Sequence, residues 1–254
     1  MAMLYNRIAI GLARRIKRFY TSFFGYRDYR KFVIISRSRT GSTLLMSLLD
    51  SHPNIECVGE IFKNTQGIAP FTVWVRYFGK RLKRIKAVGF RMFYYHPENG
   101  DQKVWELLKA DSSIVIVHLT RQHLLRMLLS QRIGVKTNRW KQRENEKTPL
   151  ALRDKQIYLS VLECEAFFLD TTRFERETRQ SFVNHTVIEL VYEDLVANKS
   201  RALLPVFEGF KVPTVTTTTD LIKQNKEFLS ELCVNYLELK SYFINSEWAH
   251  LFDE

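Results

Sequence analysis

The feature that most constrains the fold is a short apolar run that stops at a cluster of small polar residues. Lys31 to Ser36 reads KFVIIS, which is typical of a strand buried on both faces of a parallel sheet. It leads into RSRTGST and then into a helical pattern over residues 42–51, which His52-Pro53 ends. A tight turn between a buried strand and a helix N-terminus directs several backbone N–H groups to one point, where anions bind. The sequence therefore predicts a phosphate-type loop in an α/β protein.

Three further segments predict strands of the same sheet, namely residues 87–95 (AVGFRMFYY), 113–119 (SIVIVHL) and 186–191 (TVIELV). A helix to about Ile133 follows the second of them. A long helical stretch from Thr148, as N-cap before Pro149, to Phe182 precedes the third. Its expected inward positions are Leu152, Ile157, Leu159, Leu162, Ala166 and Leu169. This alternation predicts an α/β fold with a central parallel sheet flanked by helices, like that of the P-loop NTPases, and with a helical insertion.

The net charge of +12 is concentrated in two segments. Residues 1–31 hold eight Lys or Arg against Asp28 alone, and residues 76–91 hold seven with no acid, so the other 207 residues sum to about −2. Such patches suit a polyanionic ligand, nucleic acid or an anionic membrane surface, and charge does not choose among them. We divide the chain into an N-terminal basic helix, residues 1–30, and one domain, residues 31–254.

Residues 4–24 place apolar side chains at helical spacing among arginines, which predicts an amphipathic basic helix. Such a helix either lies on an anionic bilayer or packs on its own domain, and both alternatives stay open. The cysteines Cys57, Cys164 and Cys233 lie far apart, which indicates core thiols in a reducing compartment and no metal site. We find no apolar stretch of about 20 residues and no secretion signal, and so expect a cytoplasmic protein. The sequence leaves open whether residues 4–24 contact a membrane surface.

The residues of the loop define its chemistry. Gly41 allows close backbone approach to an oxyanion, Ser42 and Thr43 supply hydroxyl donors, and Arg39 supplies a fixed charge. The loop departs from a Walker A loop, because position 42 is Ser rather than Lys, and the strand over residues 113–119 ends without the acid that would hold Mg²⁺. Both absences count against a nucleotide kinase. A sulfuryl group carries less charge than a phosphoryl group and can be transferred without a metal.

Three regions together resemble a known family. The stretch SRSRTGSTLLMSLLDSHPNI followed by GE resembles the 5′-phosphosulfate loop of sulfotransferases that use 3′-phosphoadenosine 5′-phosphosulfate (PAPS). The stretch VIVHLTRQHLLRMLLSQRIGVKTNRW resembles their 3′-phosphate-binding strand and helix. Residues 221–252 resemble the C-terminal segment of the nodulation-factor type, in which motifs like VGFR at 88–91 and YEDL at 192–195 also recur. The resemblance covers most of residues 31–254.

This resemblance implies a site. Its cofactor-binding residues would be Arg37, Ser38, Arg39, Thr40, Gly41, Ser42, Thr43, Arg121, Ser130 and Lys223, with no metal. Arg121 and Ser130 are nine residues apart, or about 900° of helix, so they converge only if Arg121 precedes a helix that begins near His123. Glu60, in the GE motif, would be the catalytic base. Arg39 would be catalytic by bridging the cofactor phosphate and the transferred sulfuryl oxygens.

Several assignments keep alternatives. Rival bases are His52, which suits the turn before Pro53; His118, which suits a core strand; and His96, expected in an exposed loop. Arg91 either assists the chemistry or pairs with a carboxylate. The resemblance predicts a PAPS-dependent sulfotransferase acting on a hydroxyl of a carbohydrate or glycolipid, with no nucleic acid as partner. The alternative is a basic nucleic-acid- or membrane-surface-binding protein without that activity.

Overall fold

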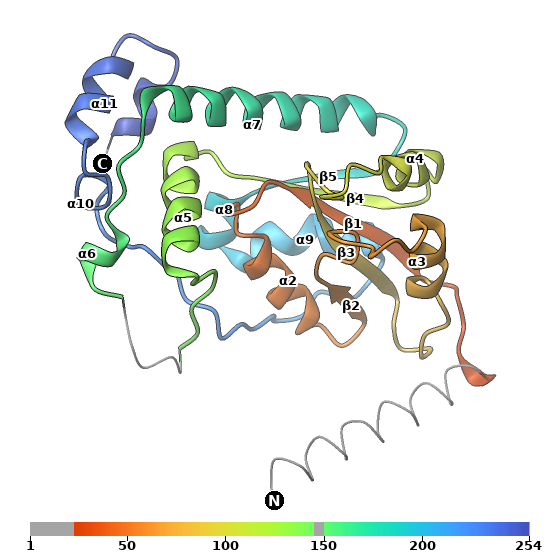
Figure 1. Cartoon of the computed structure of the whole chain (residues 1–254). Coiled ribbons are helices and arrows are strands. Elements are labelled where there is room, and N and C mark those ends of the chain that lie inside the picture. The colour runs from red at the N-terminus through yellow and green to blue at the C-terminus, as the bar shows by residue number, and fades with distance from the viewer. Residues whose placement is uncertain (1–22, 145–149, 254) are drawn as a thin grey trace, which may run out of the picture.

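A five-stranded parallel sheet forms the centre of the protein (Figure 1), whose computed structural model describes residues 23–144 and 150–253. The strand order is β2-β3-β1-β4-β5, and every neighbouring pair is parallel. The strands are β1 (Arg30–Ser36), β2 (Ile55–Val58), β3 (Ala87–Phe93), β4 (Val115–Thr120) and β5 (Val187–Val191). This arrangement confirms the predicted fold class, and β2 is the strand that the sequence analysis missed.

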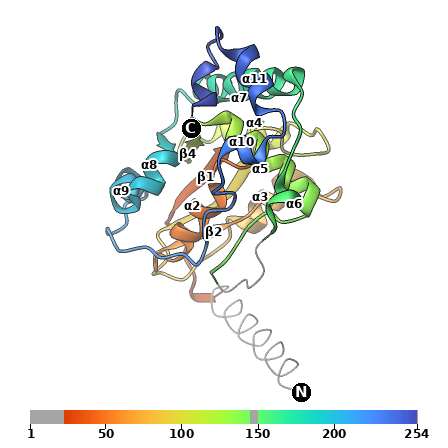
Figure 2. The same ribbon diagram turned by 90° about the vertical axis from the view of Figure 1, so that its left-hand side faces the viewer.

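Helices cover both faces of the sheet. One face packs against α2 (Ser42–Asp50), α8 (Tyr192–Ala197) and α9 (Lys199–Phe210). The other packs against α3 (Pro70–Tyr77), α4 (Lys103–Ala110) and the C-terminal part of α7 (Val161–Ser181). Figure 2 shows α8 and α9 standing together on one side of the sheet. None of the helices in the described ranges has the length and apolar character needed to cross a membrane.

The central strand β1 explains this layering. Phe32 and Ile34 belong to the core under α2 and α9, whereas Val33 and Ile35 belong to the core under α3 and α4. All four side chains are fully buried. Because successive residues of a strand point to opposite faces, a strand covered on both sides needs a continuous apolar run.

A third hydrophobic core lies among the helices beside the sheet. It joins α5 (Leu124–Thr137) and the start of α7 to the C-terminal elements α10 (Leu229–Leu232), α11 (Tyr236–Phe243) and η1 (Ala249–Phe252). The short α6 (Leu152–Lys155) lies against α5 and α10. This cluster fixes α5, whose first turn faces the carboxyl ends of the strands.

The long helix expected over residues 148–182 is wrong, because the chain leaves the helical path after α6. Ile157 pairs with the segment before α11: its N–H donates to Leu232 O at 2.8 Å, and its carbonyl accepts from Val234 N at 2.9 Å. A new helix, α7, then begins at the N-cap Ser160. Thr148 and Pro149, the expected start, lie outside the described residues, as do residues 4–22 of the expected N-terminal helix.

The packing expected along that stretch is confirmed only for Leu159, which is fully buried, and for Ile157, which packs against the third core. Leu162 and Leu169 are 77% and 58% exposed, and Leu152 and Ala166 are also exposed. The buried positions of α7 are instead Cys164, Phe167, Phe168, Thr171 and Thr178. These positions recur at helical spacing in a helix that begins at Ser160. The sequence analysis did not identify Ser160 as the start of a helix.

Gly89 supplies a stability test of the sheet. A Cβ at Gly89 would lie 2.4 Å from both the carbonyl oxygen and the ring of Phe32 on the neighbouring strand β1. We expect Gly89→Ala to lower the free energy of unfolding by about 2–3 kcal/mol through overpacking, measured by urea denaturation. Gly59→Ala is the control, since nothing lies within 4 Å of its added Cβ. Equal stability of the two variants would contradict this packing.

Candidate functional site

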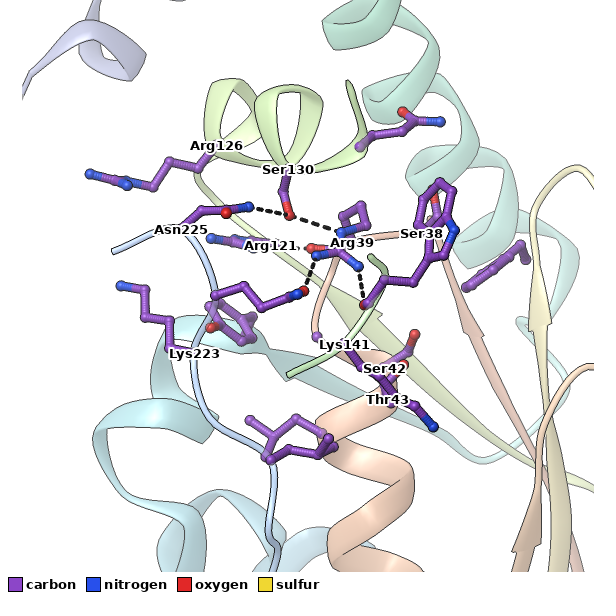
Figure 3. Close-up of a pocket in the computed structure, with 18 of the residues that line it drawn as sticks. Ser38, Arg39, Ser42, Thr43, Arg121, Arg126, Ser130, Lys141, Lys223 and Asn225 are labelled. Atoms are coloured by element: carbon purple, nitrogen blue, oxygen red, sulfur yellow. Dashed lines mark hydrogen bonds between the residues drawn. The ribbon is translucent and has the colours of Figure 1, made fainter. Parts of the chain in front are cut away.

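A cavity of about 580 Å³ lies at the carboxyl ends of β1, β3 and β4 (Figure 3). Its walls come from the loop between β1 and α2, from the segment after β3, from α5 and from residues 221–225. These segments are far apart in the sequence. In open α/β sheets this is the edge at which ligands bind.

Gly41 shapes the loop after β1. It is the N-cap of α2 with a left-handed φ of 93°, and no side chain caps the helix there. An added Cβ would lie 2.3 Å from the ring of Tyr192, so the packing of α8 requires glycine as much as the backbone angle does. The uncapped first-turn N–H groups of α2 remain available to an anion, and the helix dipole favours one.

Arg91 connects the loop to Glu60. Its Nη1 donates to Ser42 Oγ at 3.1 Å and to Thr43 Oγ1 at 2.9 Å, while Nη2 donates to Glu60 Oε1. The two charged side chains are only 13% and 19% exposed. Of the two alternatives for Arg91, the structure shows the pairing with a carboxylate, and the same side chain also contacts the loop hydroxyls.

His96 lies behind the same carboxylate. Its ring is buried rather than exposed as expected, and Nε2 lies 3.9 Å from Glu60 Oε2. The N–H of Phe93 donates to Nδ1 at 3.3 Å, which assigns the ring proton to Nε2. Burial lowers the pKa of His96, so the neutral ring directs an N–H toward Glu60.

The other two rival bases, His118 and His52, lie outside the cavity lining. His118 is fully buried, with Nε2 at 2.8 Å from Tyr94 Oη and Nδ1 at 3.0 Å from Glu189. His52 Nε2 lies 2.9 Å from the carbonyl of Pro213. These contacts give both rings a structural role, so of the three rival bases only His96 reaches the site.

Arg39 crosses the cavity toward α5. Its Nε donates to Ser130 Oγ at 2.8 Å, and its Nη1 and Nη2 donate to Trp140 O at 2.6 Å and Gln224 Oε1 at 2.8 Å. Arg121 Nη1 in turn donates to the carbonyl of Arg39 at 3.0 Å. Burial lowers the pKa of Arg39 to about 10, which leaves the guanidinium charged at neutral pH. The first loop and the entrance to α5 thus share one space.

The start of α5 matches the predicted geometry. The helix begins at Leu124 with His123 as N-cap, so Arg121 precedes it and meets Ser130 at the cavity. Sequence analysis missed Arg126, which lines the same wall. The signal was present, because residues 126 and 130 are four apart and therefore on one helix face. Asn225 adds an amide 3.5 Å from Ser130 Oγ.

Positive charge dominates the lining. The cationic side chains are Arg39, Lys63, Arg91, Arg121, Arg126, Lys141, Lys199 and Lys223, against the carboxylates of Glu60 and Glu98. The predicted residues that line the cavity are Ser38, Arg39, Gly41, Ser42, Thr43, Glu60, Arg121, Ser130 and Lys223. Arg37 and Thr40 lie beside it. The Arg37 guanidinium is 3.9 Å from the ring of Phe167, and the buried Thr40 hydroxyl donates to the Arg37 carbonyl.

Comparison with known proteins agrees with the resemblance deduced from the motifs, although no family model matches the chain. The chain is 26% identical to nodulation protein H of Rhizobium tropici, an alignment that covers 87% of this chain and 92% of that protein. It is 21% identical to nodulation protein H of Rhizobium meliloti, with 88% and 95% covered. The chain is therefore similar to nodulation protein H over most of its length.

Solved sulfotransferases are similar at lower identity. One from Alicyclobacillus acidocaldarius superposes with a TM-score of 0.48 at 14% identity, covering 84% of this chain and 91% of that chain. A mouse sulfotransferase complexed with PAP superposes with a TM-score of 0.40 at 13% identity, covering 92% and 78%.

The N-cap of α5 predicts a pH effect on stability. The His123 ring accepts the N–H of Arg126, and burial, with Arg126 and Arg121 nearby, lowers its pKa to about 4. The unfolded chain binds this proton from about pH 6.5 downward, whereas the folded protein resists it until about pH 4. The free energy of unfolding is therefore unaffected by protonation of His123 above about pH 6.5. It falls as the pH drops from 6.5 toward 4, because only the unfolded chain takes up the proton in that range.

We expect His123→Asn, which keeps a capping side chain without a titrating ring, to reduce this acid sensitivity. The measurement is the thermal unfolding midpoint at pH 7.5 and pH 5 in both proteins. A smaller fall in the variant is the expected result, and an equal fall would contradict the assignment.

Proposed function

We propose that this protein is an enzyme that transfers a sulfuryl group from PAPS to a hydroxyl of a carbohydrate or glycolipid. The observation that carries the proposal is the meeting of two anion-binding regions in one cavity. The N-terminus of α2 with Ser42 and Thr43 forms the first. Arg121, Ser130 and their neighbours on α5 and residues 223–225 form the second. A ligand that is anionic at both ends fits this arrangement.

The adenosine donor suits both regions. Its 5′-phosphosulfate would meet the uncapped amides of α2, and its 3′-phosphate would meet Ser130, Arg121 and Arg126. A cavity of about 580 Å³ is within the range of nucleotide-sized sites. ADP lacks a 3′-phosphate and would leave the second region without an anion.

Arg39 and Arg91 would have different roles, in donor binding and in stabilisation of the leaving group. Arg39 bonds Ser130 at the second region, so we propose that it binds the 3′-phosphate there in addition to its predicted contact with the sulfuryl oxygens. Arg91 stands against the loop hydroxyls and Glu60, so we assign to it positive charge at the leaving oxygen. A charge aimed at that oxygen stabilises the transition state more than the ground state.

Glu60 is the proposed base. Its Oε1 is bound by Arg91, while Oε2 faces His96 and the cavity. Oε2 takes the proton of the acceptor hydroxyl as the acceptor oxygen bonds to sulfur. The bond from sulfur to the donor's phosphate oxygen breaks in line, and adenosine 3′,5′-bisphosphate leaves with the electron pair. Arg91 and His96 would position the carboxylate for this step.

The acceptor class follows from the nodulation-type resemblance and from the walls of the cavity. Trp140 and Tyr95 line the cavity and are 45% and 41% exposed, which suits stacking on sugar rings. Trp74 and Tyr94 are buried and belong to the core. We place the enzyme in the cytoplasm, in keeping with the free, buried thiols of Cys57, Cys164 and Cys233.

Calorimetry tests the donor site. Adenosine 3′,5′-bisphosphate is expected to bind more tightly than ADP, because only the former fills both anion-binding regions. Ser130→Ala should weaken the bisphosphate by about 10-fold or more, since it removes a hydrogen bond to a charged group, and leave ADP unchanged. Equal affinity for the two nucleotides would refute the proposal.

Glu60→Gln tests the base. The variant is expected to retain bisphosphate binding and to lose at least about 100-fold in turnover of a PAPS-dependent sulfation assay. Glu98→Gln is the matched control, because Glu98 also lines the cavity but pairs with Lys63 at 3.4 Å in an exposed position. Full activity of Glu60→Gln would move the role of base to another group.

A further inference from the structure

The two basic segments are largely unused by the cavity. Of the basic residues in 76–91, Arg91 alone lines it. The segments before β1 and β3 instead lead into the amino ends of those strands, because β1 begins at Arg30 and β3 at Ala87. In a parallel sheet these ends form the edge opposite the cavity. In Figure 1, α3 accordingly lies at the right of the sheet and α5 at the left.

Backbone pairing joins the two segments. Tyr26 N donates to Arg81 O at 3.0 Å and Arg81 N donates to Tyr26 O at 2.9 Å. The Tyr26 hydroxyl donates to Lys83 O at 2.6 Å, and Lys86 Nζ lies 5.4 Å from the Tyr26 ring. Segments more than fifty residues apart in the sequence thus form one surface. We call residues 23–30 and 68–86 the amino-edge face.

The exposed charges of this face are mostly positive. The exposed basic residues are Arg27, Arg76, Lys80, Lys83, Arg84 and Lys86, and Asp28 is the exposed acid of these two segments. Arg81 is half-buried and pairs with Glu56 at 2.7 Å, so it is held inside the structure. A cluster of this size attracts an anionic surface.

Apolar side chains are exposed on the same elements. Phe71 and Val75 are 62% and 46% exposed, whereas Trp74 on a neighbouring face of α3 is buried in the core. Positions 71 and 75 are four apart, so they share one helix face. Ile68, just before α3, and Phe23 and Phe24, at the entry of the chain, are also exposed.

We propose that the amino-edge face docks on the surface of an anionic lipid bilayer. Its basic side chains would meet the phosphate headgroups, and Phe71 and Val75 would enter the headgroup boundary. Nucleic acid explains the charge but not exposed aliphatic residues such as Ile68 and Val75, which offer no plane for stacking on bases. The chain before Phe23 carries the basic amphipathic sequence pattern of residues 4–22, which supplies more of the same chemistry at the point of entry.

Docking by this face would leave the cavity open. The cavity lies at the carboxyl edge of the sheet, so the nucleotide and the acceptor could enter from the aqueous side. The proposal does not depend on the reaction at the cavity, since none of the residues named on the face lines it.

The test is sedimentation of the full chain with vesicles of phosphatidylcholine, with and without phosphatidylserine, at about 0.1 M salt. The triple variant Arg76→Gln, Lys83→Gln, Arg84→Gln removes three exposed charges of the face. Each is expected to weaken binding to the anionic vesicles about fivefold, for a combined loss of about 100-fold. The matched control, Arg153→Gln, Arg201→Gln, Lys240→Gln, removes three exposed charges from α6, α9 and α11. It should bind as the unmodified protein does.

A second pair of variants tests the apolar contribution. Phe71→Ser with Val75→Ser should weaken vesicle binding at unchanged net charge, whereas Leu162→Ser with Leu237→Ser, both 77% exposed elsewhere, should not. Circular dichroism and the thermal unfolding midpoint check that each variant keeps its fold.

Three outcomes would overturn the proposal. The first is equal binding to vesicles with and without phosphatidylserine. The second is unchanged binding of the triple variant, which would assign any membrane contact to residues 1–22 alone. The third is tighter binding to a short DNA duplex than to vesicles, with Phe71 and Val75 irrelevant, which would make this face a nucleic-acid surface.

Discussion

Burial of β1 on both faces is the constraint on which the site depends. Because Phe32 to Ile35 are covered by two separate cores, the strand cannot shift or end elsewhere without exposing apolar side chains. The chain must therefore turn at the carboxyl edge of the sheet, where Gly41 takes the left-handed angle and starts α2. This turn sets the direction of the uncapped amides of α2, so the position of the proposed anion site is a consequence of the core.

The cavity holds several buried positive charges, which destabilise the protein when no anion is bound. Arg39 and Arg121 lie close together, since Arg121 donates to the carbonyl of Arg39, and their burial lowers the pKa of both guanidinium groups. Arg39 offsets this cost through hydrogen bonds to Ser130, Gln224 and the carbonyl of Trp140. A phosphate at Ser130 would replace these neutral acceptors with charged ones, which are stronger partners for an arginine. This difference in hydrogen-bond strength supports the proposed binding of an anion beside Ser130.

The sequence predicted those parts of the fold that follow from local pattern. The apolar run of β1 and the convergence of Arg121 with Ser130 needed only periodicity and helix geometry. The strand β2 was missed because its four residues, Ile55–Val58, alternate too briefly to stand out. The break before α7 was missed because its cause is the pairing of Ile157 with a segment some seventy-five residues away.

The site was predictable to the same extent. Loop residues and Glu60 could be placed at the cavity by motif, but their partners could not, because partners come from distant elements. Arg39 turns toward Ser130, which lies ninety-one positions further along the chain. Arg91 on β3 reaches Glu60 and the loop hydroxyls because β3 pairs directly with β1.

The position of the charge is more informative than its total of +12. β1 has seven residues, which at about 3.3 Å each separates the two edges of the sheet by about 20 Å. Exposed charges are largely screened beyond about 10 Å at 0.1 M salt. The amino-edge face therefore adds little to the potential inside the cavity, and the cavity adds little to that of the face. The net charge sums two clusters that the length of a strand separates, so each cluster would attract its own ligand independently of the other.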